Sequence, residues 1–207
     1  MRLALPQRGF TLIELLVGIT IAGVLAAIGV PALSGWLQNA KIDNTAKEAL
    51  AGLQMARTEA IRRNVPVEFV LTGTATDQAD LANTLTPAAN GVNWAVRAAS
   101  DVAGAPFELV NARAGAEGAN SGTATRAGTI TALNPPGFGG TVTFQGLGGT
   151  VPPVRYEFLV TNPAAGDCVA AGGPIRCKRI DVSPGGRITA CDPDPALVAG
   201  DSRACPP

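Results

Sequence analysis

A long stretch without charge near the N-terminus constrains the fold of this chain most. From Leu15 to Ala40, 26 consecutive residues carry no charged side chain. At a rise of about 1.5 Å per residue, a helix of this length spans roughly 39 Å, more than the ~30 Å hydrocarbon core of a bilayer. Arg2 and Arg8 precede the stretch, and basic residues beside a membrane helix stay on the cytoplasmic side. The sequence therefore predicts a single-pass membrane helix, with the chain after Lys41 outside the cytoplasm.

A cleaved secretory signal is the simpler alternative for the same stretch. Such signals have an apolar region of about 7–15 residues without acid, whereas this stretch is longer and follows Glu14 directly. A carboxylate at the end of a membrane helix is costly unless it is paired, protonated or near the headgroups. Glu14 is therefore either a functional residue or a headgroup-level acid without a partner.

The residues around Glu14 form a specific motif. The sequence Arg8-Gly9-Phe10-Thr11-Leu12-Ile13-Glu14-Leu15-Leu16 resembles the class III signal of type IV prepilins and type II secretion pseudopilins. The resemblance implies a leader of residues 1–9, cleavage after Gly9 by a prepilin peptidase and methylation of the new terminal amine on Phe10. It also implies that Glu14 attracts the terminal amine of a neighbouring subunit during filament assembly. An ammonium and a carboxylate attract strongly in low dielectric, in agreement with this role.

The helical pattern continues beyond the uncharged stretch. Apolar residues recur every three or four positions and place one stripe on an amphipathic helix: Ile42, Ala46, Ala49, Leu50, Leu53, Ala60 and Ile61. Two acid-before-base pairs at a spacing of four are expected on the solvent faces: Asp43 with Lys47, and Glu59 with Arg63. Pro31 predicts a kink. We expect one bent helix over residues 10–63, with residues 10–36 as its transmembrane part.

The sequence at the end of this helix indicates a particular group within these families. Ala-Arg-Thr-Glu-Ala-Ile at residues 56–61, with Pro66 and Val67 shortly after, is similar to the GspH/FimT group of minor pilins and pseudopilins. In that group a similar helix end is followed by a strand. Asn64 and Pro66 also end the helix on physical grounds, because the residue before a proline is pushed toward extended geometry.

Short extended segments separated by Gly, Pro and Asn follow. The candidate strands are residues 67–71, 92–97, 107–110, 128–133, 141–145, 154–161, 176–182 and 187–191. Their β-branched and aromatic residues suit antiparallel sheets with one face covered. Residues 72–91 and 113–128 are expected to be mobile loops, and no further helix is expected. Packed on the helix stripe, these strands give an α+β, type IV pilin-like fold: a long N-terminal membrane-spanning helix on an antiparallel β-sheet domain of residues 64–207.

All four cysteines fall in the last forty residues, in the part predicted to be exported, where disulfides persist. Sequential pairing, Cys168 with Cys177 and Cys191 with Cys205, closes two small loops. Each closure typically contributes about 2–4 kcal/mol. The pairing of Cys177 with Cys191 and of Cys168 with Cys205 remains open. A metal cluster is less favoured, because the spacings lack the short pairs of zinc sites.

Composition argues against most enzymatic functions. The chain has no histidine, which excludes a Ser-His-Asp triad and an imidazole base. Its 16 basic and 16 acidic residues balance, so no bulk charge indicates nucleic-acid binding. The three tail acids Asp192, Asp194 and Asp201 miss the EF-hand spacing for calcium. We expect no enzymatic activity, no metal and no cofactor.

One local basic cluster is left on a hairpin expected to turn at residues 183–186: Arg176, Lys178, Arg179 and Arg187. Some FimT-type minor pilins bind DNA through a C-terminal Gly-Arg-x-Arg motif, and Gly186-Arg187-Ile188-Thr189 keeps only its first half. Losing one phosphate contact weakens binding uniformly. These four are the candidate DNA-binding residues.

The sequence thus predicts a minor pilin of the GspH/FimT type that assembles into a type IV pilus or a priming complex at its tip. A type II secretion pseudopilin and a DNA-binding minor pilin for natural transformation are the alternatives. The expected partners are a prepilin peptidase, other pilin or pseudopilin subunits, the inner membrane and, for the last alternative, DNA. The chain would lie in the inner membrane with a periplasmic C-terminal domain, and then in a pilus or pseudopilus.

Overall fold

The computed structural model describes residues 11–74, 76, 80–100, 102, 104–114, 129–197 and 200–206. Gly9 and Phe10, and most of the predicted loop 113–128, lie outside these residues. The chain divides into two compact units, Met1–Leu37 and Gln38–Pro207.

Helix α1, Leu12–Arg63, contains 52 residues and continues through Pro31. It ends where Asn64 adopts a left-handed conformation with φ of 55°. The next strand begins at Val67, directly after Pro66.

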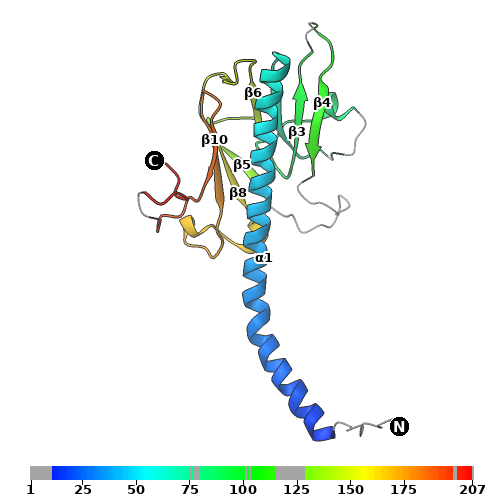
Figure 1. Ribbon diagram of the computed structural model, residues 1–207, viewed down its shortest axis with the longest axis vertical. Coiled ribbons are helices and arrows are strands. Elements are labelled where there is room, and N and C mark those ends of the chain that lie inside the picture. The colour runs from blue at the N-terminus through cyan, green and yellow to red at the C-terminus, as the bar shows by residue number, and fades with distance from the viewer. Residues whose placement is uncertain are drawn as a thin grey trace, which may run out of the picture. The chain divides into compact units, whose positions relative to one another are not determined.

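The described residues of the second unit form two antiparallel sheets of five strands each, whose strands lie beside helix α1 in Figure 1. The first has the order β4 (Glu108–Arg113), β3 (Asn93–Ala98), β1 (Val67–Thr72), β6 (Thr141–Phe144), β7 (Thr150–Val151). The second has the order β10 (Ile188–Cys191), β9 (Lys178–Val182), β8 (Tyr156–Thr161), β5 (Thr129–Asn134), β2 (Asn90–Gly91). All eight predicted segments form strands, and the two-residue strands β2 and β7 are additional.

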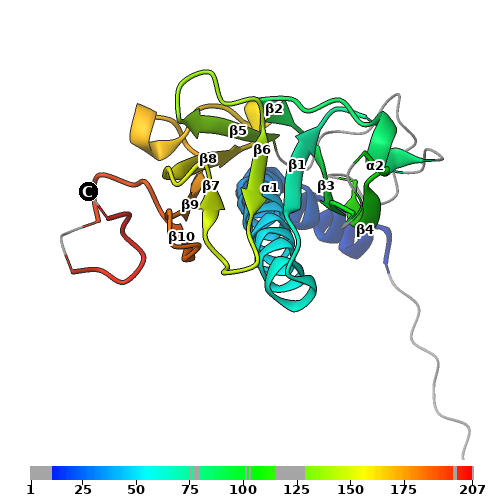
Figure 2. The same ribbon diagram turned by 90° about the horizontal axis from the view of Figure 1, so that it is seen from above.

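One core joins the helical segment from Gln38 onward to both sheets. Figure 2 shows the strands of both sheets gathered on one side of this segment. The helix contributes the buried residues Ile42, Ala46, Ala49, Leu53, Ala56 and Ala60. The sheets contribute large side chains such as Phe69, Phe144 and Phe158, which are also fully buried. The small helix residues let the aromatic side chains approach the helix backbone. At Gly52 a Cβ atom would lie 2.9 Å from the ring of Trp94.

The predicted apolar stripe is correct except at its last residue. The side chain of Ile61 is 50% exposed, while Ala56, which the prediction omitted, is completely buried. Ile61 lies over Gly148, in the turn between β6 and β7. Ile61 therefore packs on a turn rather than on a sheet, although its neighbour Ala60 is buried in the core.

The prediction that residues 72–91 form only a loop is wrong. They contain helix α2, Leu81–Thr84, and strand β2. Leu81 and Leu85 pack against Val70 and Ala95 in a second buried cluster on the outer face of the first sheet. Two short 3-10 helices, η1 (Pro163–Ala165) and η2 (Val169–Ala171), also follow residue 65. Local sequence did not indicate these elements, because tertiary contacts stabilise such short segments.

Candidate functional site

The N-terminal unit places Glu14 in the first turn of α1. The backbone N–H of Glu14 donates to the hydroxyl of Thr11 at 3.3 Å, so Thr11 caps the start of the helix. Glu14 is exposed, and the partial positive charge of a helix N-terminus favours an acid at this position. The predicted cleavage and methylation sites at Gly9 and Phe10 lie outside the described residues.

The helix surface that follows Glu14 is apolar and exposed. Among the described residues of this unit, the exposed large hydrophobic side chains are Leu12, Ile13, Leu15, Leu16, Val17, Ile19, Ile21, Val24, Leu25, Leu33, Trp36 and Leu37. Within the part of the chain that the structure describes, no helix has the length and apolarity needed to cross a membrane.

Two disulfides are present in the second unit, and they have the sequential pairing. Cys168 is bonded to Cys177 and Cys191 to Cys205. The first closes a loop before β9, and the second ties the tail to the end of β10. The described residues contain no group of three His, Cys, Asp or Glu side chains placed to hold a metal ion.

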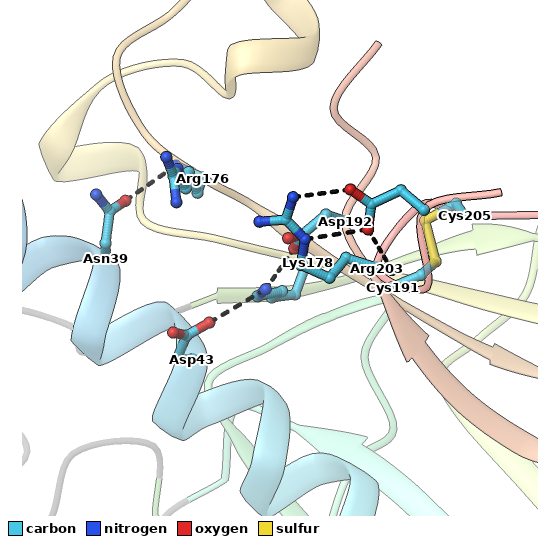
Figure 3. A network of polar contacts seen from close by, with 9 residues as sticks. Asn39, Asp43, Arg176, Lys178, Cys191, Asp192, Arg203 and Cys205 are labelled. Carbon is cyan, nitrogen blue, oxygen red and sulfur yellow. Dashed lines mark hydrogen bonds and ion pairs between the residues drawn. A yellow bond between two sulfur atoms is a disulfide. The ribbon is translucent and has the colours of Figure 1, made fainter. Parts of the chain in front are cut away.

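Lys178 lies in an ion-pair group that joins the helix, β9 and the tail (Figure 3). Its ammonium group contacts the carboxylate of Asp192 and lies 3.5 Å from that of Asp43 on the helix. This ion pair differs from the predicted pairing of Asp43 with Lys47. Since β9 and the helix are far apart in sequence, helix periodicity could not have indicated it. Lys178 therefore serves first to hold three elements together.

Arg179 projects from the opposite face of β9 and is also ion-paired. Its Nε lies 3.3 Å from the buried carboxylate of Asp181, and its Nη2 donates to the backbone oxygen of Pro206 at 2.8 Å. Arg155 approaches the same carboxylate at 3.2 Å. Two of the four candidate DNA-binding residues, Lys178 and Arg179, thus have acidic partners within the domain.

The other two candidates, Arg176 and Arg187, lie far apart. Arg176 precedes β9, whereas Arg187 lies beside the turn that connects β9 to β10. Lys178 and Arg187 are separated by the length of β9, about 13 Å at 3.3 Å per residue. The four cations are therefore spread from the start of β9 to the turn that follows it. DNA binding by these residues stays a prediction.

The glycine of the partial DNA motif has a conformational role. Gly186 has a φ of 78°, and its N–H donates to the oxygen of Ser183 at 2.8 Å in the hairpin turn. A Cβ atom at Gly186 would lie 1.8 Å from the backbone oxygen of Gly148. The same oxygen accepts a hydrogen bond of 3.1 Å from Nε of Arg57 on the helix. Gly186 thus permits the close packing of two turns against the helix.

The predicted ion pair between Glu59 and Arg63 is confirmed, and it belongs to a larger group. Glu59 accepts hydrogen bonds from Arg62 and from Arg63, and Arg63 also binds Glu108 of β4 at 2.6 Å. The hydrogen bonds from Arg62 and then Arg63 lower the pKa of Glu59 from 4.5 to about 2. This group connects the end of α1 to the edge of the first sheet.

The lowered pKa of Glu59 predicts a specific pH dependence of stability. Between about pH 2 and pH 4.5, the carboxylate of Glu59 is charged in the folded protein but mostly protonated in the unfolded chain. It therefore stabilises the fold above about pH 4.5, and this contribution is lost as pH falls toward about 2. We expect Glu59→Gln to lower the urea midpoint at pH 7, with a difference from the parent protein that shrinks below pH 4.5. The control Glu48→Gln removes an acid outside this ion-pair group. An equal midpoint difference at pH 7 and pH 3 would contradict the assignment.

The described architecture is that of a pilin subunit: an N-terminal helix whose later part packs on antiparallel sheets. The profile of the family described as "Type II transport protein GspH" matches residues 45–186, and that of the "Prokaryotic N-terminal methylation motif" matches residues 5–30. The chain belongs to the GspH/FimT family, within the superfamily of type IV pilins and type II secretion pseudopilins.

Two solved structures are similar to the chain, both crystal structures of the type IV minor pilin FimU of Pseudomonas aeruginosa (strain PAO1). The form in space group P65 is 18% identical, with a TM-score of 0.46 over 72% of this chain and 90% of FimU. The form in space group P21 is 19% identical, with a TM-score of 0.47 over 74% of this chain and 90% of FimU. No curated protein sequence matches the chain significantly.

Proposed function

We propose that the chain is a minor pilin that is cleaved after Gly9, held in the inner membrane by its apolar helix, and then incorporated into a type IV pilus or its tip complex. The observation that carries this proposal is the combination of the N-terminal methylation motif with Glu14 directly before the uncharged stretch of the helix, Leu15 to Ala40. Its work is assembly rather than turnover of a substrate.

The exposed apolar side chains of the helix support assembly, because their exposure to water is unfavourable. Burying a large aliphatic side chain contributes about 1.5–3 kcal/mol, and Leu12, Ile13 and Leu25 are each more than 60% exposed. Lipid covers such a surface before assembly, and the helices of other pilin subunits cover it in a filament. In the filament, the terminal amine of a neighbouring subunit's Phe10 neutralises Glu14.

A type II secretion pseudopilus is the second candidate assembly, and the printed description of the matching family, a type II transport protein, supports it. The two assemblies need the same leader, the same helix and the same acid. Neighbouring genes separate them: genes for other minor pilins support the pilus, and genes for secretion components support the pseudopilus.

Processing at Gly9 is the direct test of this proposal. We expect the protein purified from cells to begin with N-methylated Phe10 and to be present in sheared filaments. Mass spectrometry of the N-terminal peptide and immunoblots of the sheared fraction measure the two properties. The control is the same protein from cells without the prepilin peptidase, which should keep its leader. An intact leader in filament-borne protein would overturn the proposal.

A further inference from the structure

The second unit begins at Gln38, and one loop contacts its first two residues. The amide Nδ2 of Asn162 donates to Oε1 of Gln38. The backbone N–H of Arg176 donates to Oδ1 of Asn39 at 2.9 Å, as Figure 3 shows. The loop of residues 162–177 therefore lies at the end of the domain where the chain enters from its apolar segment.

Several interactions make this loop rigid. The disulfide between Cys168 and Cys177 closes it, and two backbone hydrogen bonds between Cys168 or Val169 and the returning chain, of 2.9 and 2.8 Å, cross it. At Gly173 a Cβ atom would lie 2.0 Å from the backbone oxygen of Asp167. The loop therefore presents a fixed surface.

The exposed surface of the loop is formed by small residues and a few charges. Its exposed apolar residues are Pro163, Ala164, Ala170, Ala171 and Pro174. Asp167 and Arg176 are exposed as well. Without long apolar side chains, the loop can approach a polar surface closely but has little to insert into hydrocarbon.

A second cation lies on the other flank of the helix. Lys41 is two residues after Asn39, roughly 200° further around a helix with 3.6 residues per turn. Since Asn39 faces Arg176, Lys41 is directed away from Arg176, and its side chain is half-exposed. Trp36, two residues before the domain begins, is 66% exposed, and tryptophan is enriched at membrane interfaces.

The loop lies next to the residues that follow the apolar segment, and this position determines which molecules it can contact. If the predicted transmembrane residues 10–36 are held in the bilayer, Gln38 and Asn39 lie within a few ångström of the headgroups, at about 1.5 Å of rise per residue. The headgroup layer on each side is about 5–8 Å thick. A loop hydrogen-bonded to these two residues then faces phosphate groups, and the two cations Arg176 and Lys41 outnumber the one exposed acid of the loop, Asp167.

We propose that residues 162–177 and Lys41 form a contact surface for the phospholipid headgroups of the membrane that holds the apolar segment. Arg176 and Lys41 pair with lipid phosphates on the two flanks of the helix. The surface rests on the proposed membrane anchoring and extends it: the domain lies on the bilayer before assembly, and this contact must break when the subunit enters a filament. Each cation contributes about a fivefold preference for anionic lipid.

A photocrosslinking experiment on the full chain tests this surface. The protein is reconstituted into nanodiscs of phosphatidylcholine, with or without phosphatidylglycerol, that carry a lipid with a photoactivatable headgroup. We expect adducts in the peptide containing residues 162–177, increased by phosphatidylglycerol and reduced at least fivefold in the Lys41→Gln/Arg176→Gln double variant. The Arg176→Gln substitution keeps the backbone N–H that donates a hydrogen bond to Asn39. The control Arg62→Gln changes a mostly exposed arginine at the other end of the same helical segment and should leave the adducts unchanged.

The outcomes separate this inference from the function on which it rests. If the protein remains in the nanodiscs but the loop gives no adducts, or if the double variant gives the same yield, the headgroup surface is wrong and the anchoring stands. If the protein does not remain with the nanodiscs, both the headgroup surface and the membrane anchoring are wrong. Circular dichroism and an intact Cys168–Cys177 disulfide verify that the double variant is folded.

Discussion

The Glu14→Ala variant should be lost from filaments, by about tenfold or more relative to the parent protein. A tenfold change corresponds to about 1.4 kcal/mol, which is modest for an ammonium left without its partner at low dielectric. The variant keeps the apolar helix and should still reach the membrane. Immunoblots of sheared filaments and of the membrane fraction measure the two populations separately.

Two further variants show whether the charge of Glu14 is responsible. Glu14→Gln keeps the size and hydrogen-bonding capacity of the side chain and should fail like Glu14→Ala. Glu48→Gln removes an acid from the part of the same helix that packs on the domain, and should assemble normally. Normal incorporation of the Glu14→Ala subunit would refute the assembly role of this carboxylate.

The second large effect is expected at Gly186. Alanine there must adopt a φ of 78° and places its Cβ 1.8 Å from the oxygen of Gly148. The left-handed conformation costs about 1–2 kcal/mol, and the overlap costs a similar amount or more. We expect Gly186→Ala to lower the free energy of unfolding by about 2–4 kcal/mol. Urea unfolding of the purified protein, followed through the fluorescence of Trp94, measures this change.

The neighbouring glycine provides a matched control. Gly185 lies in the same turn, but its φ is not in the left-handed region and a Cβ would meet no atom within 4 Å. Gly185→Ala should therefore change stability by no more than about 0.5 kcal/mol. Equal stability of the two variants would mean that the turn can move away from Gly148.

The helix and the eight main strands could be predicted because their signals are local. Spacings of three and four around Ile42 and Leu53 define a helix face, and β-branched runs such as Val67–Thr72 define strands. The exposure of Ile61 could not be predicted from periodicity, because it depends on which segment lies beneath it, here the turn that contains Gly148. Helix α2 was missed because only the outer face of the first sheet, with Val70 and Ala95, makes it stable.

The candidate site was predictable in part for the same reason. The motif around Glu14 is contiguous, so the sequence displays it directly. The partners of Lys178 are not contiguous with it: Asp43 is on the helix and Asp192 on the tail, and only the fold brings these groups together. The contacts of Gln38 and Asn39 with the 162–177 loop gave no sequence signal.

The core shared by the helix and both sheets determines how the domain unfolds. Ile42, Leu53 and Ala60 lie in the same buried cluster as residues of both sheets. If either sheet separates from the helix, buried hydrophobic residues of the other sheet become exposed to water. The domain should therefore melt in one cooperative transition, and a damaged subunit would be removed by quality control as a whole instead of persisting half-formed.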